Sequence, residues 1–151
     1  MQSTYQVQNS GVSWGAPWSN VPELQGWDRV MSINVKSIFY LTAALTPLLT
    51  QGSTSTSPGR VVNISSVASL DPVADGSPVS APGNGLYSYG VSKAAVNHLT
   101  SVQAVSLGPK HITVNAILPG IFPSRMTAYG LKMYGDSITK KQLNGTYLCV
   151  Y

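Results

Sequence analysis

The sequence predicts an α/β fold, a partial doubly wound parallel sheet of three strands with two long helices. Short apolar runs, rich in β-branched residues, alternate along the chain with long stretches whose apolar residues recur at helical spacing. Consecutive strands that are separated by a helix pair in parallel through right-handed crossovers. The strands are apolar enough for burial on both faces, which is typical of such sheets.

The first half of the chain contributes one strand and one long helix. The strand is expected at residues 4–8, and a loop rich in Gly, Trp and Pro follows at 11–22. The helix is expected at 24–49, because apolar residues recur there every three or four positions. Its stripe toward the sheet is expected to consist of Trp27, Val30, Met31, Ile38, Leu41, Leu45 and Leu48.

The second half contributes two strands on either side of a second helix. A strand is expected at 60–65, where Val61, Val62 and Ile64 form a β-branched run. The helix is expected at 87–107, and it ends before Gly108-Pro109, a pair that stops helices. The last strand is expected at 112–118.

The chain is expected to divide near residue 130. Residues 1–130 hold all the predicted strands and helices, whereas 131–151 show no strand or helix pattern. We therefore expect one structured region at 1–130 and an atypical C-terminal tail at 131–151.

Tyr89 and Lys93 form the most informative pair of residues. On a helix, residues four positions apart lie on one face, about 5–6 Å apart at Cβ. A cation about 4 Å from a phenol favours the phenolate by up to ~4 kcal/mol, so Lys93 is expected to lower the pKa of Tyr89 toward neutrality. Such a phenol serves as a general acid or base. The alternatives are a surface pair without function, or a role for Tyr87, whose partner at this spacing is Val91.

Ser66 ends the predicted strand at 60–65. A hydroxyl at this point can donate a hydrogen bond to an oxygen on which negative charge develops during a reaction. Ser65 is its nearest rival for that role, and an ordinary hydroxyl at a strand end is the other interpretation.

Three tracts, 61–66 (VVNISS), 89–93 (YGVSK) and 115–120 (NAILPG), together resemble the short-chain dehydrogenases/reductases of the classical type. The resemblance implies a Rossmann-like domain, of which 1–130 would be the catalytic half. It also implies NADP or NAD as cofactor and interconversion of a small-molecule carbonyl and a secondary alcohol. Tyr89 would be the acid/base, Lys93 the pKa depressor and ribose contact, and Ser66 the donor to the carbonyl oxygen.

Further positions match this family residue by residue. Asn34 stands where the family has an asparagine that helps to hold a proton-relay water near the catalytic lysine; the alternative is that it satisfies helix backbone groups. The cofactor-binding residues that the resemblance implies are Asn9, Ser10, Gly11, Tyr89, Lys93, Pro119, Gly120, Ile121 and Ser124.

Two departures from the family pattern leave a second function open. The sequence shows no Gly-rich turn between a first strand and its helix, and the segment 71–85, rich in Pro, Gly, Ser and Ala, lengthens the connection from Ser66 to Tyr89. This segment is either a substrate lid or an insertion. The alternative function is that of a noncatalytic fragment that pairs through its helices with a full-length relative.

Composition limits the classes of partner. Only 9% of residues are charged, and the net charge of +4 is scattered, so we expect no nucleic-acid binding. No apolar run reaches 18 residues, so no membrane span is expected. Resemblance to the family implies a homo-oligomer that forms through the two long helices.

The cysteine and histidine content bears on metal binding and on the cellular compartment. Cys149 is the only cysteine, which excludes an intrachain disulfide and favours a reducing, cytoplasmic setting. His98 and His111 lack ligand spacing, so no metal site is expected. Trp14, Trp18 and Phe122 either line a substrate pocket or pack beside the core.

Overall fold

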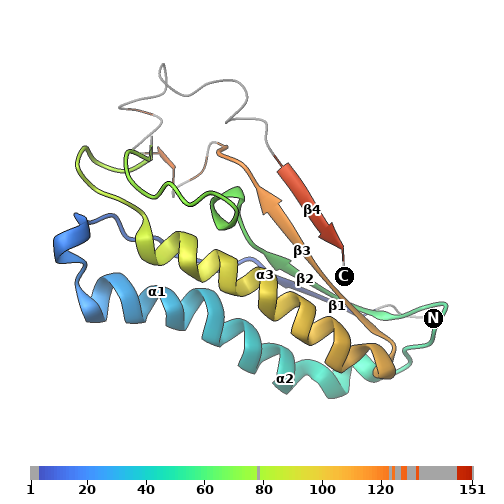
Figure 1. Ribbon diagram of the computed structural model, residues 1–151. Helices are drawn as coiled ribbons and strands as arrows, with labels where there is room; N and C mark the ends of the chain where they lie inside the picture. The colour runs from blue at the N-terminus through green and yellow to red at the C-terminus, as the bar shows by residue number, and fades with distance from the viewer. Residues whose placement is uncertain are drawn as a thin grey trace.

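The computed structural model describes residues 4–77, 79–122, 124, 127, 128, 132 and 146–150. Its four strands form one sheet in the order β1-β2-β3-β4 (Figure 1). The strands are β1 (Tyr5–Gln8), β2 (Gly59–Ile64), β3 (Ile112–Pro119) and β4 (Thr146–Val150). β1, β2 and β3 run parallel, which confirms the α/β prediction with its three parallel strands and two long helices.

β4 corrects the expectation that residues 131–151 contain no strand. It pairs antiparallel with β3, with Asn115 opposite Val150 and Pro119 opposite Thr146. The sequence pattern of a five-residue strand is weak by itself, and the free edge of β3 supplies the hydrogen-bonding partners.

Residues 23–50 form one continuous helix with two wide turns. Its segments are the π-helical turn Glu23–Asp28, α1 (Arg29–Met31), the π-helical turn Ser32–Lys36 and α2 (Ser37–Thr50). An α-helix turns 100° per residue, so every fourth residue drifts by about 40° around its surface. The π turns hold more residues each and cancel this drift. Every fourth residue is therefore buried, in the order Gly26, Val30, Asn34, Ile38 and Thr42.

Because of these wide turns, part of the apolar stripe expected at 3.6-residue spacing is wrong. Val30 and Ile38 are buried as expected, but Trp27, Leu41 and Leu48 are 40%, 47% and 56% exposed. The spacing argument assumed uniform α-helical geometry, and the wide turns rotate these side chains away from the sheet.

The second long helix, α3 (Tyr87–Leu107), lies beside the first helix on the same face of the sheet (Figure 1). Short 3₁₀ turns occur at Trp18–Asn20, Val67–Ser69 and Gly108–Lys110. The inward residues of the strands alternate with outward ones, and Tyr5 and Val7 of β1 are 65% and 61% exposed. The expected burial of the strands on both faces is therefore not found in the described residues, because the described helices cover one face only.

The space between the helices and the sheet is part apolar and part polar. Leu49, Val61, Ile112 and Val114 form an apolar cluster near the amino ends of β2 and β3. Elsewhere, inward polar side chains form hydrogen bonds between the sheet and the helices. Gln6 and Gln8 donate to Thr42, and Asn63 donates to Thr100 and Gln103.

One described helix, Glu23–Thr50, is long and apolar enough to cross a membrane by length and composition alone. The expectation of no span was based on uninterrupted apolar runs, whereas this helix passes on its mean hydropathy. The core helix of a globular domain passes the same test, and here Val30, Ile38 and Leu49 are buried against the rest of the domain.

Candidate active site

The candidate site lies at the carboxyl ends of the three parallel strands. Ligands of doubly wound folds bind at this edge of the sheet. Gly11 follows β1, Ser66 follows β2, and Gly120 follows β3. The first turns of α3 bring Tyr89 and Lys93 to the same edge, since α3 starts where the connection from β2 ends (Figure 1).

Lys93 is buried beneath Tyr89. Its side chain is 5% exposed, and its Nζ donates a hydrogen bond of 2.7 Å to the Ile64 carbonyl at the end of β2. The same Nζ lies 5.6 Å from the centre of the Tyr89 ring. The four-residue spacing therefore brings the two side chains together, but the ammonium is held by the backbone of β2.

The protonation of this pair corrects one expectation. Burial raises the pKa of Tyr89 above its usual value, and a hydrogen bond with Ser66 opposes this more weakly. Burial also lowers the pKa of Lys93 to about 8. Lys93 was expected to depress the pKa of Tyr89, but desolvation is the largest cause of the pKa shift at both residues, and it moves the pKa of Tyr89 upward. At neutral pH the Tyr89 phenol is protonated.

Ser65 and Ser66 differ in what their hydroxyls do. The Ser65 hydroxyl donates to the Lys93 backbone carbonyl at 3.0 Å and is buried in the helix–sheet interface. The Ser66 hydroxyl is beside Tyr89 and accepts a hydrogen bond of 3.2 Å from Ala68 N–H at the start of a 3₁₀ turn. Its proton remains available to donate, so the geometry favours Ser66 over its rival.

Asn34 joins three parts of the chain. Its Oδ1 accepts from Val12 N–H at 2.8 Å, and its Nδ2 donates to Val12 carbonyl and to Ser92 Oγ, each at 2.9 Å. Ser92 in turn donates to the Tyr89 carbonyl at 2.8 Å. Both amide hydrogens are occupied, and the π turn at 32–36 aims this side chain inward. π turns of this kind are frequent at functional sites.

The predicted cofactor-binding residues fall into two groups. Gly11 is close to the catalytic pair, because a Cβ there would lie 3.4 Å from Asn34 Oδ1 and 3.5 Å from Lys93 Nζ. Asn9 and Ser10 are exposed beside it. A Cβ at these distances would be in ordinary van der Waals contact, so Gly11 borders Asn34 and Lys93 directly.

The second group follows β3. Pro119 ends the strand, and Gly120 and Ile121 are half-buried after it. The Ser124 hydroxyl is within 3.0 Å of Thr127 Oγ1, so it belongs to a local turn. Among the described residues, no contact joins this group to Tyr89 or Lys93, and its part in binding stays a prediction.

Sequence reasoning missed Ser92 and Asp75 near the site, and it left Trp18 open as a residue of a pocket or of the packing. Ser92 is fully buried between Asn34 and the Tyr89 carbonyl. Asp75 accepts a hydrogen bond from the Tyr87 hydroxyl, and Trp18 packs edge-on against the Tyr87 ring with centroids 5.0 Å apart. Ser92 lies inside the 89–93 tract, so its position on the helix was available as a signal. The other two contacts join distant loops and leave no local pattern.

Metal binding finds no support in the described part of the chain. Among the residues described, no group of three or more His, Cys, Asp and Glu side chains could hold a metal ion.

Comparison with known proteins connects this geometry with one family. The family model for short chain dehydrogenases matches residues 5–134. The rhamnolipid-biosynthesis 3-oxoacyl-[acyl-carrier-protein] reductase of Pseudomonas aeruginosa is 44% identical over 123 residues, which are 82% of this chain and 44% of that protein. The 3-oxoacyl-[acyl-carrier-protein] reductase FabG of Thermotoga maritima is 31% identical over 121 residues, 80% of this chain and 43% of that protein.

Solved structures agree with the sequence comparison. The Pseudomonas aeruginosa RhlG/NADP active-site complex superimposes with a TM-score of 0.74 at 38% identity and covers 89% of this chain and 51% of that one. A putative 2-deoxy-d-gluconate 3-dehydrogenase from Agrobacterium tumefaciens with bound NADP gives a TM-score of 0.70 at 30% identity, covering 93% and 54%. The chain thus spans about half the length of these relatives. It belongs to the short-chain dehydrogenase family.

Proposed function

We propose that this protein is an NAD(P)-dependent oxidoreductase that interconverts a carbonyl and a secondary alcohol. The observation that carries the proposal is the position of Tyr89 beside Ser66 and next to the buried Lys93, whose Nζ lies 5.6 Å from the centre of the Tyr89 ring. This arrangement offers two O–H donors to one substrate oxygen. The proposed catalytic residues are Ser66, Tyr89 and Lys93, with Asn34, the fourth residue of the predicted catalytic set, as a positioning residue.

Reduction needs a proton at the carbonyl oxygen and a hydride at its carbon. When bound, the nicotinamide cofactor supplies the hydride. Tyr89 donates its phenolic proton to the oxygen as charge develops there, and Ser66 donates a second hydrogen bond to the same oxygen. The raised pKa of Tyr89 keeps the proton-donating form present at neutral pH, and oxidation reverses each transfer.

The chain's own residues fit the nicotinamide end of such a cofactor. Lys93 Nζ has one acceptor, the Ile64 carbonyl, and faces the space next to Gly11. Its remaining N–H groups can donate to ribose hydroxyls there. Asn34 fixes the wall of this space through Val12, so we assign it a positioning role. Relatives of known structure were solved with NADP, and one with NADH, so both cofactors remain candidates.

The substrate class follows from the relatives by analogy. Two of them are named 3-oxoacyl-[acyl-carrier-protein] reductases. A 3-oxoacyl thioester is therefore the first small-molecule substrate to test.

The test measures oxidation of NADPH or NADH by the 151-residue chain with a 3-oxoacyl thioester. We expect a dissociation constant for the cofactor weaker than roughly 100 μM, since the identified contacts serve only its nicotinamide side. Cofactor is therefore supplied in the millimolar range. Turnover that is lost in Ser66→Ala and Tyr89→Phe supports the proposal. Turnover that survives in Tyr89→Phe would contradict the proposal. Absence of turnover in the unmodified chain would favour a noncatalytic function, which is described next.

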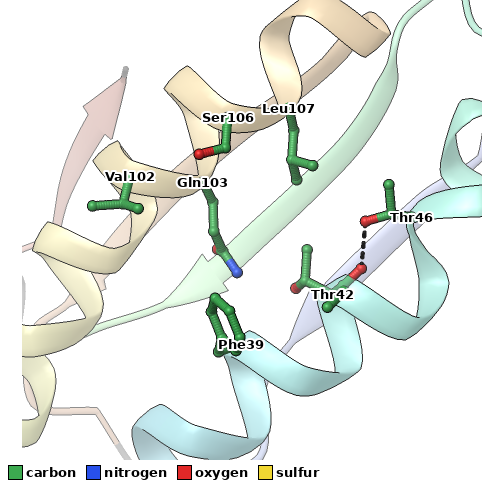
Figure 2. Close-up of a pocket in the computed structure, with 8 residues that line it drawn as sticks. Phe39, Thr42, Thr46, Val102, Gln103, Ser106 and Leu107 are labelled. Atoms are coloured by element: carbon green, nitrogen blue, oxygen red, sulfur yellow. Dashed lines mark hydrogen bonds between the residues drawn. The ribbon is translucent and has the colours of Figure 1, made fainter.

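The second candidate function is helix-mediated association, either with a second copy or with a full-length relative. The outer surfaces of the helices are apolar: Phe39, Tyr40, Val102 and Val105 are 48%, 61%, 45% and 80% exposed. A pocket of about 100 Å³ lies between α2 and α3, with Phe39, Thr42, Gln103 and Leu107 among its lining residues (Figure 2). This groove lies on the helices, away from Tyr89.

Association is tested by sedimentation of the chain and of a Val105→Glu variant. Because few charges oppose association, we expect dimers or larger species at micromolar concentration. Val105→Glu adds a charge to the helix surface and should shift the chain toward monomer. A monomer in both samples would contradict association through the helices.

A further inference from the structure

The connection at 71–86 is attached to the loop at 11–20 through backbone and side chains. Ala16 N–H donates to the Gly85 carbonyl at 3.2 Å, and Gly85 N–H donates back to Ala16 at 2.8 Å. A second bridge joins Asp75 and Gly85, and Leu86 N–H donates to Ala74 at 3.1 Å. This segment, which the sequence left as lid or insertion, is thereby connected to the loop that follows β1.

Three side chains complete this attachment, and we name Trp18, Asp75 and Tyr87 the Tyr87 cluster. The Tyr87 hydroxyl donates to Asp75 Oδ1. The Tyr87 ring meets Trp18 edge-on, at a centroid distance of 5.0 Å and an interplanar angle of 78°. The ring also lies against the backbone of Gly85, where a Cβ would come within 2.7 Å of the Tyr87 hydroxyl oxygen. The pose of Tyr87 thus depends on residue 85 being glycine.

The cluster stands at the start of the helix that carries Tyr89. The first N–H groups of a helix lack intrahelical partners and usually receive a side-chain cap. α3 has none: its N-cap residue is Leu86, which makes no side-chain cap hydrogen bond. The Asp75 carboxylate contacts the first helical residue through its side-chain hydroxyl, so it holds that residue without capping a backbone N–H group.

We infer that the Tyr87 cluster is a positioning unit for the candidate proton donor: it fixes the first turn of α3 and so holds the Tyr89 phenol against Ser66. Tyr89 is two residues after Tyr87, in the turn that lacks a cap. Movement of this turn would separate Tyr89 on α3 from Ser66, which is on a different segment after β2. The inference rests on the proposed function only in naming Tyr89 as proton donor.

The test uses two readouts that need no turnover. Amide hydrogen exchange by NMR on the 151-residue chain monitors Ala16, Gly85 and Leu86, whose N–H groups make the attachment. A ¹³C-tyrosine titration follows the pKa of Tyr89. Tyr87→Phe removes the hydroxyl but keeps the ring, so exchange at these amides should rise about tenfold, the loss expected for a hydrogen bond to a charged group.

The Tyr89 titration separates positioning from general stability. Because the Ser66 hydrogen bond lowers the pKa of Tyr89, its loss in Tyr87→Phe should raise that pKa further. Asp75→Asn keeps an acceptor oxygen but loses the charge, so both readouts should fall between those of the unmodified chain and those of Asp75→Ala.

Glycine variants supply a second route to the same outcome. Gly85→Ala displaces the Tyr87 ring without removing any group, and should reproduce Tyr87→Phe. Gly108→Ala is the matched control, because a Cβ there meets nothing within 4 Å. An unchanged Tyr89 pKa in Tyr87→Phe would overturn the inference. The Ser65 N–H, which donates to Ile117 between β2 and β3, serves as a distant reference. If its exchange rises as much as that of Ala16, Gly85 and Leu86, the inference is overturned too.

Discussion

The two ends of the helix-covered face of the sheet are built from different chemistry. Near the amino ends of the strands, Leu49, Val61, Ile112 and Val114 form a compact apolar cluster. Near the carboxyl ends, Asn34 and Lys93 are equally buried but are held by directional hydrogen bonds. Both ends lie under the same two helices.

The comparison shows what each kind of burial contributes. Apolar contacts are non-directional, so the amino end stabilises the fold through the area that it removes from water. Hydrogen bonds between buried groups require fixed geometry, and they are costly when broken. The carboxyl end therefore gives up hydrophobic stabilisation in exchange for defined positions of Tyr89 and Lys93.

The largest effect is expected at the apolar end. Leu49→Ala should lower the free energy of unfolding by about 2–5 kcal/mol, because it leaves a cavity at a residue that is 1% exposed. Leu48→Ala is the neighbouring control, and at 56% exposure it should cost less than about 0.5 kcal/mol. Denaturant unfolding measures both, and equal losses would contradict the assignment of the inward face.

At the polar end, Tyr89→Phe should reduce turnover rather than stability. In an active form of the protein, loss of the general acid should lower kcat by at least about 10²-fold. Tyr87→Phe should lower it by much less, because Tyr87 acts only through position, and Tyr5→Phe on β1 should leave it unchanged. Equal losses in Tyr89→Phe and Tyr87→Phe would reject Tyr89 as the proton donor.

Lys93 should make stability depend on pH. Its pKa is about 8 in the folded state and 10.5 in its ordinary state. Between these values the unfolded chain binds a proton that the folded chain does not, so stability rises with pH. Lys93→Met lacks this titrating group. The unfolding free energy of the unmodified chain, minus that of Lys93→Met, should therefore rise by about 2 kcal/mol from about pH 7.5 to 10.

Chemical denaturation at several pH values measures this difference. A difference that is constant over that interval would show that Lys93 is solvated enough to keep its ordinary pKa.

The smallest effect is expected between the two ends, at Thr100. Its hydroxyl accepts from Asn63 Nδ2 at 2.9 Å and is fully buried. Thr100→Val keeps the shape and removes the hydrogen bond, so it should cost about 1 kcal/mol. Ser101→Ala, on the next and less buried position, is the control for the loss of a helix hydroxyl. A cost like that of Leu49→Ala would mean that polar pairing, rather than apolar area, dominates the interior.

The sequence by itself determined the order of the strands and helices, and it brought Ser66, Tyr89 and Lys93 together as candidates. These predictions depend on local information: alternation within strands, apolar periodicity within helices, and a four-residue spacing that places two side chains on one helix face. The spacing correctly predicted that Tyr89 and Lys93 are neighbours.

Only the tertiary structure decided the features that depend on distant partners. The π turns rotate Trp27 and Leu48 outward and Asn34 inward, and nothing in the local periodicity signals that winding. β4 pairs with a strand more than 25 residues earlier in the chain. The upward shift of the Tyr89 pKa also depends on tertiary structure, because it is caused by burial. The four-residue spacing identifies only the neighbours of Tyr89 on its own helix.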